Sequence, residues 1–91
     1  MTENIFTDQK LKHLKALVEA VKQESEMQIM KWGVQARTSF EWLTYTTEEL
    51  GSLAKAIGEW EYSLGSPERV RAEAIQVATL CLKIAEMFED A

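Results

Sequence analysis

Two carboxylates stand out because helical spacing places them among apolar side chains. At about 100° per residue, Glu49 shares a direction with Trp42 on one predicted helix. Glu73 lies between the directions of Val77 and Leu80 on the next predicted helix. A carboxylate taken out of water without a partner is costly, so it takes up a proton or binds a cation. Two of them on neighbouring helices favour an oxygen-ligand site for Mg²⁺, or for Mn²⁺ in its place.

An ion pair is an equally good interpretation of the second carboxylate. Glu73 is within possible reach of Arg69, Lys55 or Lys83, and a buried ion pair needs no metal. The remaining acids of the second predicted helix face outward and are surface charges on this view: Glu41, Glu48 and Glu59.

Three helices are expected to position these residues. The first would follow a loose segment 1–6, begin at a cap on Thr7 or Asp8 and run to about Lys31. Gly33 would end it, and a loop would continue to Thr38.

The second helix would span about 40–62 after a cap on Thr38 or Ser39. Ser66 and Pro67 are typical of a helix start, so the third would run from Pro67 to about Glu89. The fold class is therefore all-α, with one domain over 1–91.

Each predicted helix carries an apolar stripe that we expect to face the core. The stripes are Leu14, Leu17, Val18, Val21 and Ile29; then Leu43, Thr47, Leu50, Ala54 and Ile57; then Val70, Ala74, Val77, Cys81, Ile84 and Phe88. Cys81, the single cysteine, is read as a core thiol. The third helix is also apolar on its far side, at Ile75, Ala78, Leu82 and Ala85. Three helices cannot surround it, so a second copy of the chain is expected to help.

Composition narrows the function further. The chain has a net charge of −5, which disfavours a nucleic acid polymer as a partner. No apolar run resembles a signal peptide or a membrane span, so the sequence favours a soluble cytoplasmic protein without a membrane partner.

The segment TEELGSLAKAI at 47–57, followed by EAIQVA at 73–78, resembles the MazG-like nucleotide pyrophosphohydrolases. Lys31-Trp32-Gly33 and Glu41-Trp42-Leu43 resemble the short, phage-borne branch of that family, and the likeness covers most of 28–88. The resemblance implies an oligomeric all-α bundle, a homodimer or homotetramer. It also implies Mg²⁺-dependent cleavage of a nucleoside triphosphate to the monophosphate and pyrophosphate.

Carried over by position, the resemblance makes Glu49 and Glu73 metal ligands, the same two carboxylates that the helical spacing had marked. The other two ligand positions hold Ser52 and Gln76 where the family has Glu and Asp, which lowers the charge of the site and its affinity for a hard cation.

The resemblance also gives Glu48 the role of the base that orients a water. The expected nucleotide contacts are Glu24, Gln28, Lys31, Trp32, Arg37 and Lys83, each of which is otherwise an ordinary surface or packing residue. The alternative function is a catalytically degenerate module of the same fold that binds a nucleotide or a protein partner.

Overall fold

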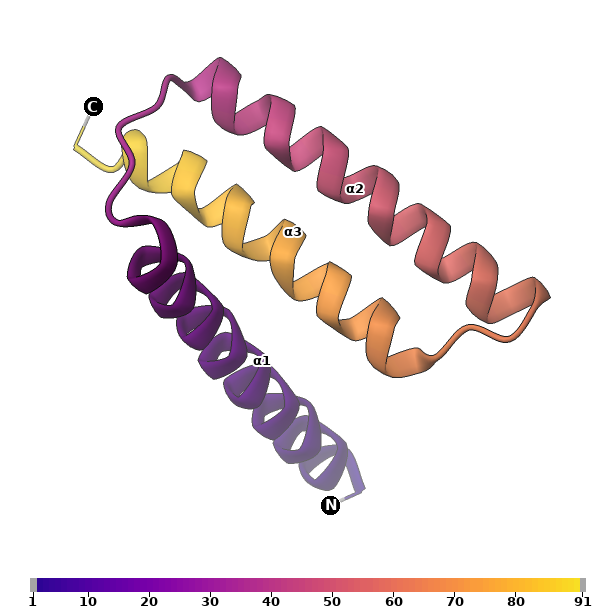
Figure 1. Cartoon of the computed structure of the whole chain (residues 1–91). Coiled ribbons are helices and arrows are strands. Elements are labelled where there is room, and N and C mark those ends of the chain that lie inside the picture. The colour runs from indigo at the N-terminus through magenta and orange to yellow at the C-terminus, as the bar shows by residue number, and fades with distance from the viewer. Residues whose placement is uncertain (1, 91) are drawn as a thin grey trace.

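The computed structural model describes residues 2–90, with side chains from Thr7 onward, and these residues form three α-helices. They are α1 (Thr2–Trp32), α2 (Ser39–Tyr62) and α3 (Pro67–Met87). Figure 1 shows α2 and α3 side by side in opposite directions, with α1 crossing below α3. α3 is the central element, because it packs against both α2 and α1. The all-α prediction is confirmed for the described chain.

The helix ends follow the local sequence signals. Gly33 takes a φ of +74°, and its N–H donates to Ile29 O at 2.7 Å, which ends α1 in the left-handed conformation that glycine favours. Thr38 caps α2 in a reciprocal box with Glu41, each side chain accepting the other residue's N–H. Ser66 caps α3 ahead of Pro67 by accepting from Arg69 N at 3.2 Å. These caps confirm the predicted starts of the second and third helices.

The first helix starts earlier than expected. α1 begins at Thr2, not at a cap on Thr7 or Asp8. Segment 2–6 contains neither glycine nor proline, so nothing local interrupts the helix there. Met1 and the side chains of 2–6, where we expected a loose segment, lie outside the described residues.

The face of α2 that packs on α3 is not the stripe that we predicted. The face with Trp42, Glu49 and Ala56 is covered by α3, and Ala56 is only 1% exposed. The predicted stripe is exposed at Leu43, Thr47, Leu50, Ala54 and Ile57. Both faces are apolar, so periodicity alone could not choose between them.

Fewer side chains of α3 are buried than its many apolar residues would suggest. Thr79 is 1% exposed and donates its hydroxyl to Ile75 O at 2.7 Å, so this buried polar group is satisfied within its own helix. Leu80 is also buried. Cys81, predicted to be a core thiol, is exposed instead, because neither α1 nor α2 covers that side of α3.

Among the side chains of α1 that the structure describes, those from 7 to 19 are exposed, and burial begins in the second half of the helix. Its half-buried residues are Ala20, Val21, Glu24, Ser25 and Gln28. The predicted stripe continues toward the N-terminus as Leu14, Leu17 and Val18, all of them exposed. The radius of gyration is 15.6 Å, whereas a compact chain of this length would have about 12 Å. No helix among the described residues has the length and apolar character that a bilayer crossing requires.

The small core makes each of its members important. We expect Leu80→Ala to lower the free energy of unfolding by about 3 kcal/mol, because it removes one of the few buried apolar side chains and leaves a cavity in its place. Urea denaturation followed by circular dichroism measures this. Met30→Ala, on an exposed side chain of α1, is the control and should change stability by less than about 0.5 kcal/mol.

Candidate functional site

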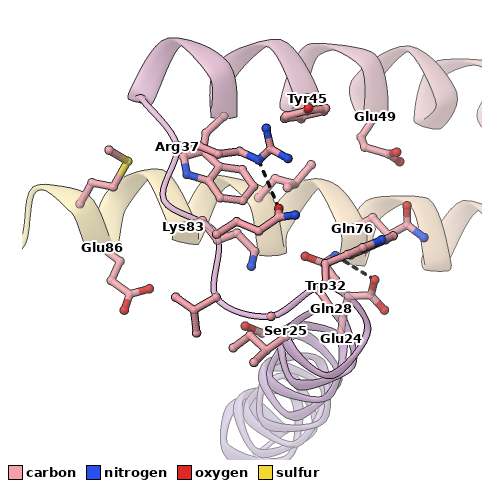
Figure 2. Close-up of a pocket in the computed structure, with 17 residues that line it drawn as sticks. Glu24, Ser25, Gln28, Trp32, Arg37, Tyr45, Glu49, Gln76, Lys83 and Glu86 are labelled. Carbon is pink, nitrogen blue, oxygen red and sulfur yellow. Dashed lines mark hydrogen bonds between the residues drawn. The ribbon is translucent and has the colours of Figure 1, made fainter.

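A cleft of about 800 Å³ lies where the end of α1, the loop 33–38, the start of α2 and the second half of α3 meet. Its walls come from residues far apart in the sequence, so it exists only in the folded chain. Figure 2 shows Glu49, Gln76 and Glu24 toward one end of this cleft, and Arg37, Tyr45 and Lys83 toward the other. One end is thus acidic, and the other combines cations with aromatic rings.

The acidic end is built around two carboxylates on facing helices. Glu49 lines the cleft from α2, and Glu73 on α3 lies close enough to Glu49 for the two side chains to interact. Glu73 Oε2 is buried and has no hydrogen-bond partner among the described residues. A buried oxygen without a partner is costly, so this position favours a bound cation.

The ion pair that would have explained Glu73 does not form. Arg69 pairs with Glu59 at the turn between α2 and α3. The ammonium of Lys83 lies 5.3 Å from the ring centre of Trp42, and Lys55 is exposed. Among the described residues no cation pairs with Glu73.

The electrostatics of Glu49 reflect this arrangement. Partial burial raises the pKa of Glu49 above its usual range. The hydrogen bond with Glu73 raises that pKa further, and so does the negative charge of Glu73. The charges of Glu48 and Glu24 act in the same direction. A positive charge that entered the acidic end would oppose each of these causes and favour the ionised form of Glu49.

The raised pKa has a consequence for stability that is testable without any ligand. The folded chain binds the Glu49 proton more tightly than the unfolded chain, so stability falls as pH rises from about 4.5 through the raised pKa. We expect Glu49→Gln to melt at a higher temperature than the wild type at neutral pH in metal-free buffer. Melting curves of both proteins from pH 4 to pH 8 should show this difference shrink on acidification. A difference that does not depend on pH would contradict the assignment.

The third carboxylate at this end comes from α1. Glu24 lines the cleft, and its Oε1 accepts from Gln28 Nε2 at 3.0 Å. Even so, the side chains described by the structure include no group of three acidic, histidine or cysteine residues placed to hold a metal ion. The donor set for a cation is therefore the pair Glu49 and Glu73, with Gln76 beside them in the cleft wall. Carboxylate and amide oxygens suit Mg²⁺ or Mn²⁺, and the orphaned oxygen of Glu73 fits such an ion.

Two residues expected in the site lie elsewhere. Ser52 is half-buried, is not part of the cleft wall, and donates its hydroxyl to Glu48 O at 3.5 Å on its own helix. Glu48 is exposed and also outside the cleft wall, so it is badly placed to orient a water on a ligand bound there. The physical reason is that the Glu48 side chain lies on the solvent-facing side of α2, away from the cleft.

The cationic end contains two of the expected nucleotide contacts, Arg37 and Lys83. Arg37 lies 4.8 Å from the ring centre of Tyr45 and 5.8 Å from that of Trp42, and it also pairs with Glu41 at 3.7 Å. Lys83 sits near the same Trp42 ring and forms no ion pair with a described carboxylate.

Trp32 and Gln28 belong to the cleft wall, as expected, whereas Lys31 does not. The Lys31 ammonium instead lies 4.6 Å from the ring centre of Trp32.

Sequence reasoning missed the contribution of Tyr45 and of the loop after α1. The loop residues Val34 and Gln35 complete one wall of the cleft. The sequence did contain a signal for the contact between Arg37 and these rings. Arg37 comes just before a helix whose first two turns carry Trp42 and Tyr45. A loop that folds back over those rings brings the guanidinium onto them.

Comparison with family models, with curated proteins and with solved structures found no match for this chain. Any function assigned to the chain therefore depends on the residues of the cleft and on the sequence resemblance.

Proposed function

We propose that this chain is a Mg²⁺-dependent nucleoside triphosphate pyrophosphohydrolase that works as a homodimer or homotetramer of the MazG-like type. The observation that carries the proposal is the carboxylate pair Glu49 and Glu73, which has no cation partner among the described residues. Glu49 lines the same cleft as Lys83. A metal-bound triphosphate supplies both missing charges: the cation meets the carboxylates, and the phosphates meet the lysine.

Each part of the cleft has a role in this proposal. Glu49 and Glu73, with the side-chain oxygen of Gln76, would hold the metal ion. When bound, the ion would neutralise charge on the phosphate oxygens and polarise the phosphorus centre. Lys83 and Arg37 would bind the phosphate oxygens that remain exposed.

The proton acceptor in this proposal is Glu24 and not Glu48. Glu24 is the remaining carboxylate at the acidic end of the cleft, whereas Glu48 points outward. Water would attack the α-phosphorus, the bond to the bridging oxygen would break, and pyrophosphate would leave. Glu24 would take the proton that the water gives up.

The aromatic rings could position the rest of the nucleotide. Trp32 lines the cleft and remains 57% exposed, so its ring is open to a planar ligand. Trp42 is buried and already has a cation above it, so packing explains it fully. Trp60 lies outside the cleft wall.

A release assay for pyrophosphate tests the proposal. The purified chain is incubated with canonical ribonucleoside and deoxyribonucleoside triphosphates and with dUTP, in Mg²⁺, in Mn²⁺ and in EDTA. We expect metal-dependent release of pyrophosphate from at least one of them. Absence of pyrophosphate release from every one of these triphosphates, with Mg²⁺ and with Mn²⁺, would contradict the hydrolytic proposal.

The second candidate function is nucleotide binding without hydrolysis. It is favoured by the position of Ser52, whose hydroxyl bonds to its own helix and offers no ligand to the cleft. Calorimetric binding of a non-hydrolysable triphosphate with Mg²⁺, in a protein that releases no pyrophosphate, would support it. Metal-dependent turnover that is lost in Glu49→Gln would exclude it.

A further inference from the structure

One carboxylate beside the cleft has no role in the hydrolytic proposal. Glu41 lies in the first turn of α2 and is not part of the cleft wall. Its Oε2 lies 3.7 Å from Nη1 of Arg37, a residue that does line the wall. Its Oε1 accepts the N–H of Thr38 at 3.0 Å in the helix cap. The two oxygens of this carboxylate thus serve two different partners, one of them in the cleft.

The guanidinium of Arg37 is held at the cationic end of the cleft by three kinds of neighbour. Its Nε donates to Oε1 of Gln35 at 3.2 Å, and its central carbon lies 4.8 Å from the ring centre of Tyr45 (Figure 2). Glu41 adds a negative charge on the helix that carries this ring. The side chain of Arg37 is only 27% exposed, so these neighbours keep most of it against the chain.

Arg37 shares the ring of Trp42 with a second cation. The guanidinium carbon lies 5.8 Å from the centre of that ring, and the ammonium of Lys83 lies 5.3 Å from it. Two positive charges near one ring repel each other, and an arginine on a loop can relieve the repulsion by turning into solvent. The negative charge of Glu41 beside Arg37 offsets that repulsion, and so favours the position of Arg37 at the cleft.

The carboxylate of Glu41 keeps its charge at neutral pH. Its hydrogen bonds with Thr38 lower the pKa of Glu41 below its usual range, and the charge of Arg37 acts in the same direction. Glu41 is therefore ionised under any condition in which a triphosphate would bind.

The ion pair leaves Arg37 able to bind an anion. A separation of 3.7 Å is that of an ion pair and exceeds the length of a hydrogen bond. The hydrogen bond that Arg37 makes with a described side chain uses its Nε–H, so the N–H groups on both Nη atoms remain for a ligand. A guanidinium commonly binds two phosphate oxygens at once through such donors.

We propose that Glu41 is a positioning residue, which keeps the Arg37 guanidinium over the rings and ready for the phosphate oxygens of a triphosphate. This inference rests on the proposed function, because it takes from it the anion that Arg37 would bind. Without Glu41, Arg37 is in place in a smaller fraction of the chains, and the apparent affinity for the anion falls with that fraction. A carboxylate that acted by its charge alone would have the opposite effect, because it repels an anion bound nearby.

Calorimetric binding of inorganic tripolyphosphate in Mg²⁺ tests this role without a nucleotide. Glu41→Gln is the informative variant, because its amide oxygen can still accept the N–H of Thr38 while the charge is lost. We expect this variant to raise the Kd by about fivefold while circular dichroism stays helical. An unchanged or lower Kd would overturn the inference, and so would a wild type that binds no tripolyphosphate.

A double-mutant cycle tests whether Glu41 acts through Arg37. In an Arg37→Met background, Glu41→Gln should no longer weaken binding, because the group that it positions is gone. Thr38→Ala is the structural control, since it removes the acceptor for the N–H of Glu41 and leaves the ion pair in place. It should lower the melting temperature and change the Kd by less than about twofold. Weakening of equal size in both backgrounds, or a larger effect of Thr38→Ala than of Glu41→Gln, would also contradict the proposal.

Failure of this inference and failure of the hydrolytic proposal give different results. Pyrophosphate release by the wild type tests hydrolysis, whereas the Kd of the variants tests Glu41. A chain that binds tripolyphosphate with this dependence on Glu41 and Arg37, and yet releases no pyrophosphate, would keep the inference and favour nucleotide binding without hydrolysis. Turnover by the wild type with an unchanged Kd in Glu41→Gln would leave hydrolysis standing and remove the positioning role.

Discussion

Replacing Glu49 by glutamine is expected to lower the turnover of the nucleoside triphosphate by about 100-fold or more, with the fold retained. Glutamine keeps the shape of the side chain and removes the charge that would hold the metal ion. Glu73→Gln should have the same effect, because its Oε2 is the buried oxygen that lacks a partner in the chain. The measurement is the steady-state rate of pyrophosphate release at saturating Mg²⁺.

The stability of these variants separates a chemical defect from a structural one. Because Glu49 has a raised pKa, its neutral replacement should stabilise the metal-free chain at neutral pH while activity is lost. Glu26→Gln, on an exposed position of α1, is the matched control and should keep both activity and melting temperature. Full activity in Glu49→Gln would remove the carboxylate pair from the mechanism.

Gln76→Asp is expected to strengthen Mg²⁺ binding by about tenfold or more in the absence of nucleotide. Gln76 lines the cleft beside Glu49, so the substitution adds a third carboxylate to the candidate metal site. It also places aspartate where the MazG-like family has it. Titration calorimetry with Mg²⁺ on the wild type and the variant measures the change.

The same substitution should have an opposite effect on the metal-free chain. A further negative charge close to Glu49 raises the cost of ionising that residue, so the melting temperature should fall at neutral pH and recover when Mg²⁺ is added. Gln23→Asp, on an exposed position of α1, is the control and should leave Mg²⁺ affinity unchanged. An equal affinity in wild type and Gln76→Asp would place the metal elsewhere or exclude it.

The sequence by itself determined the helices and most of their ends. Gly33, the capping pair Thr38 and Glu41, and the Ser66–Pro67 start act through hydrogen bonds within a few residues, so they can be read without a fold. The sequence also marked Glu49 and Glu73, because a charge on an apolar face is conspicuous wherever that face packs.

Only the tertiary structure decided which apolar face packs inside the chain. α2 carries one apolar stripe with Trp42 and another with Leu50. The stripe with Trp42 is the one that is buried against α3. The cleft likewise required three helices and a loop to meet, which put Lys83 beside Trp42 and left Glu48 and Ser52 outside. Periodicity reports that a face is apolar, whereas the partner that covers it is set by contacts between distant segments.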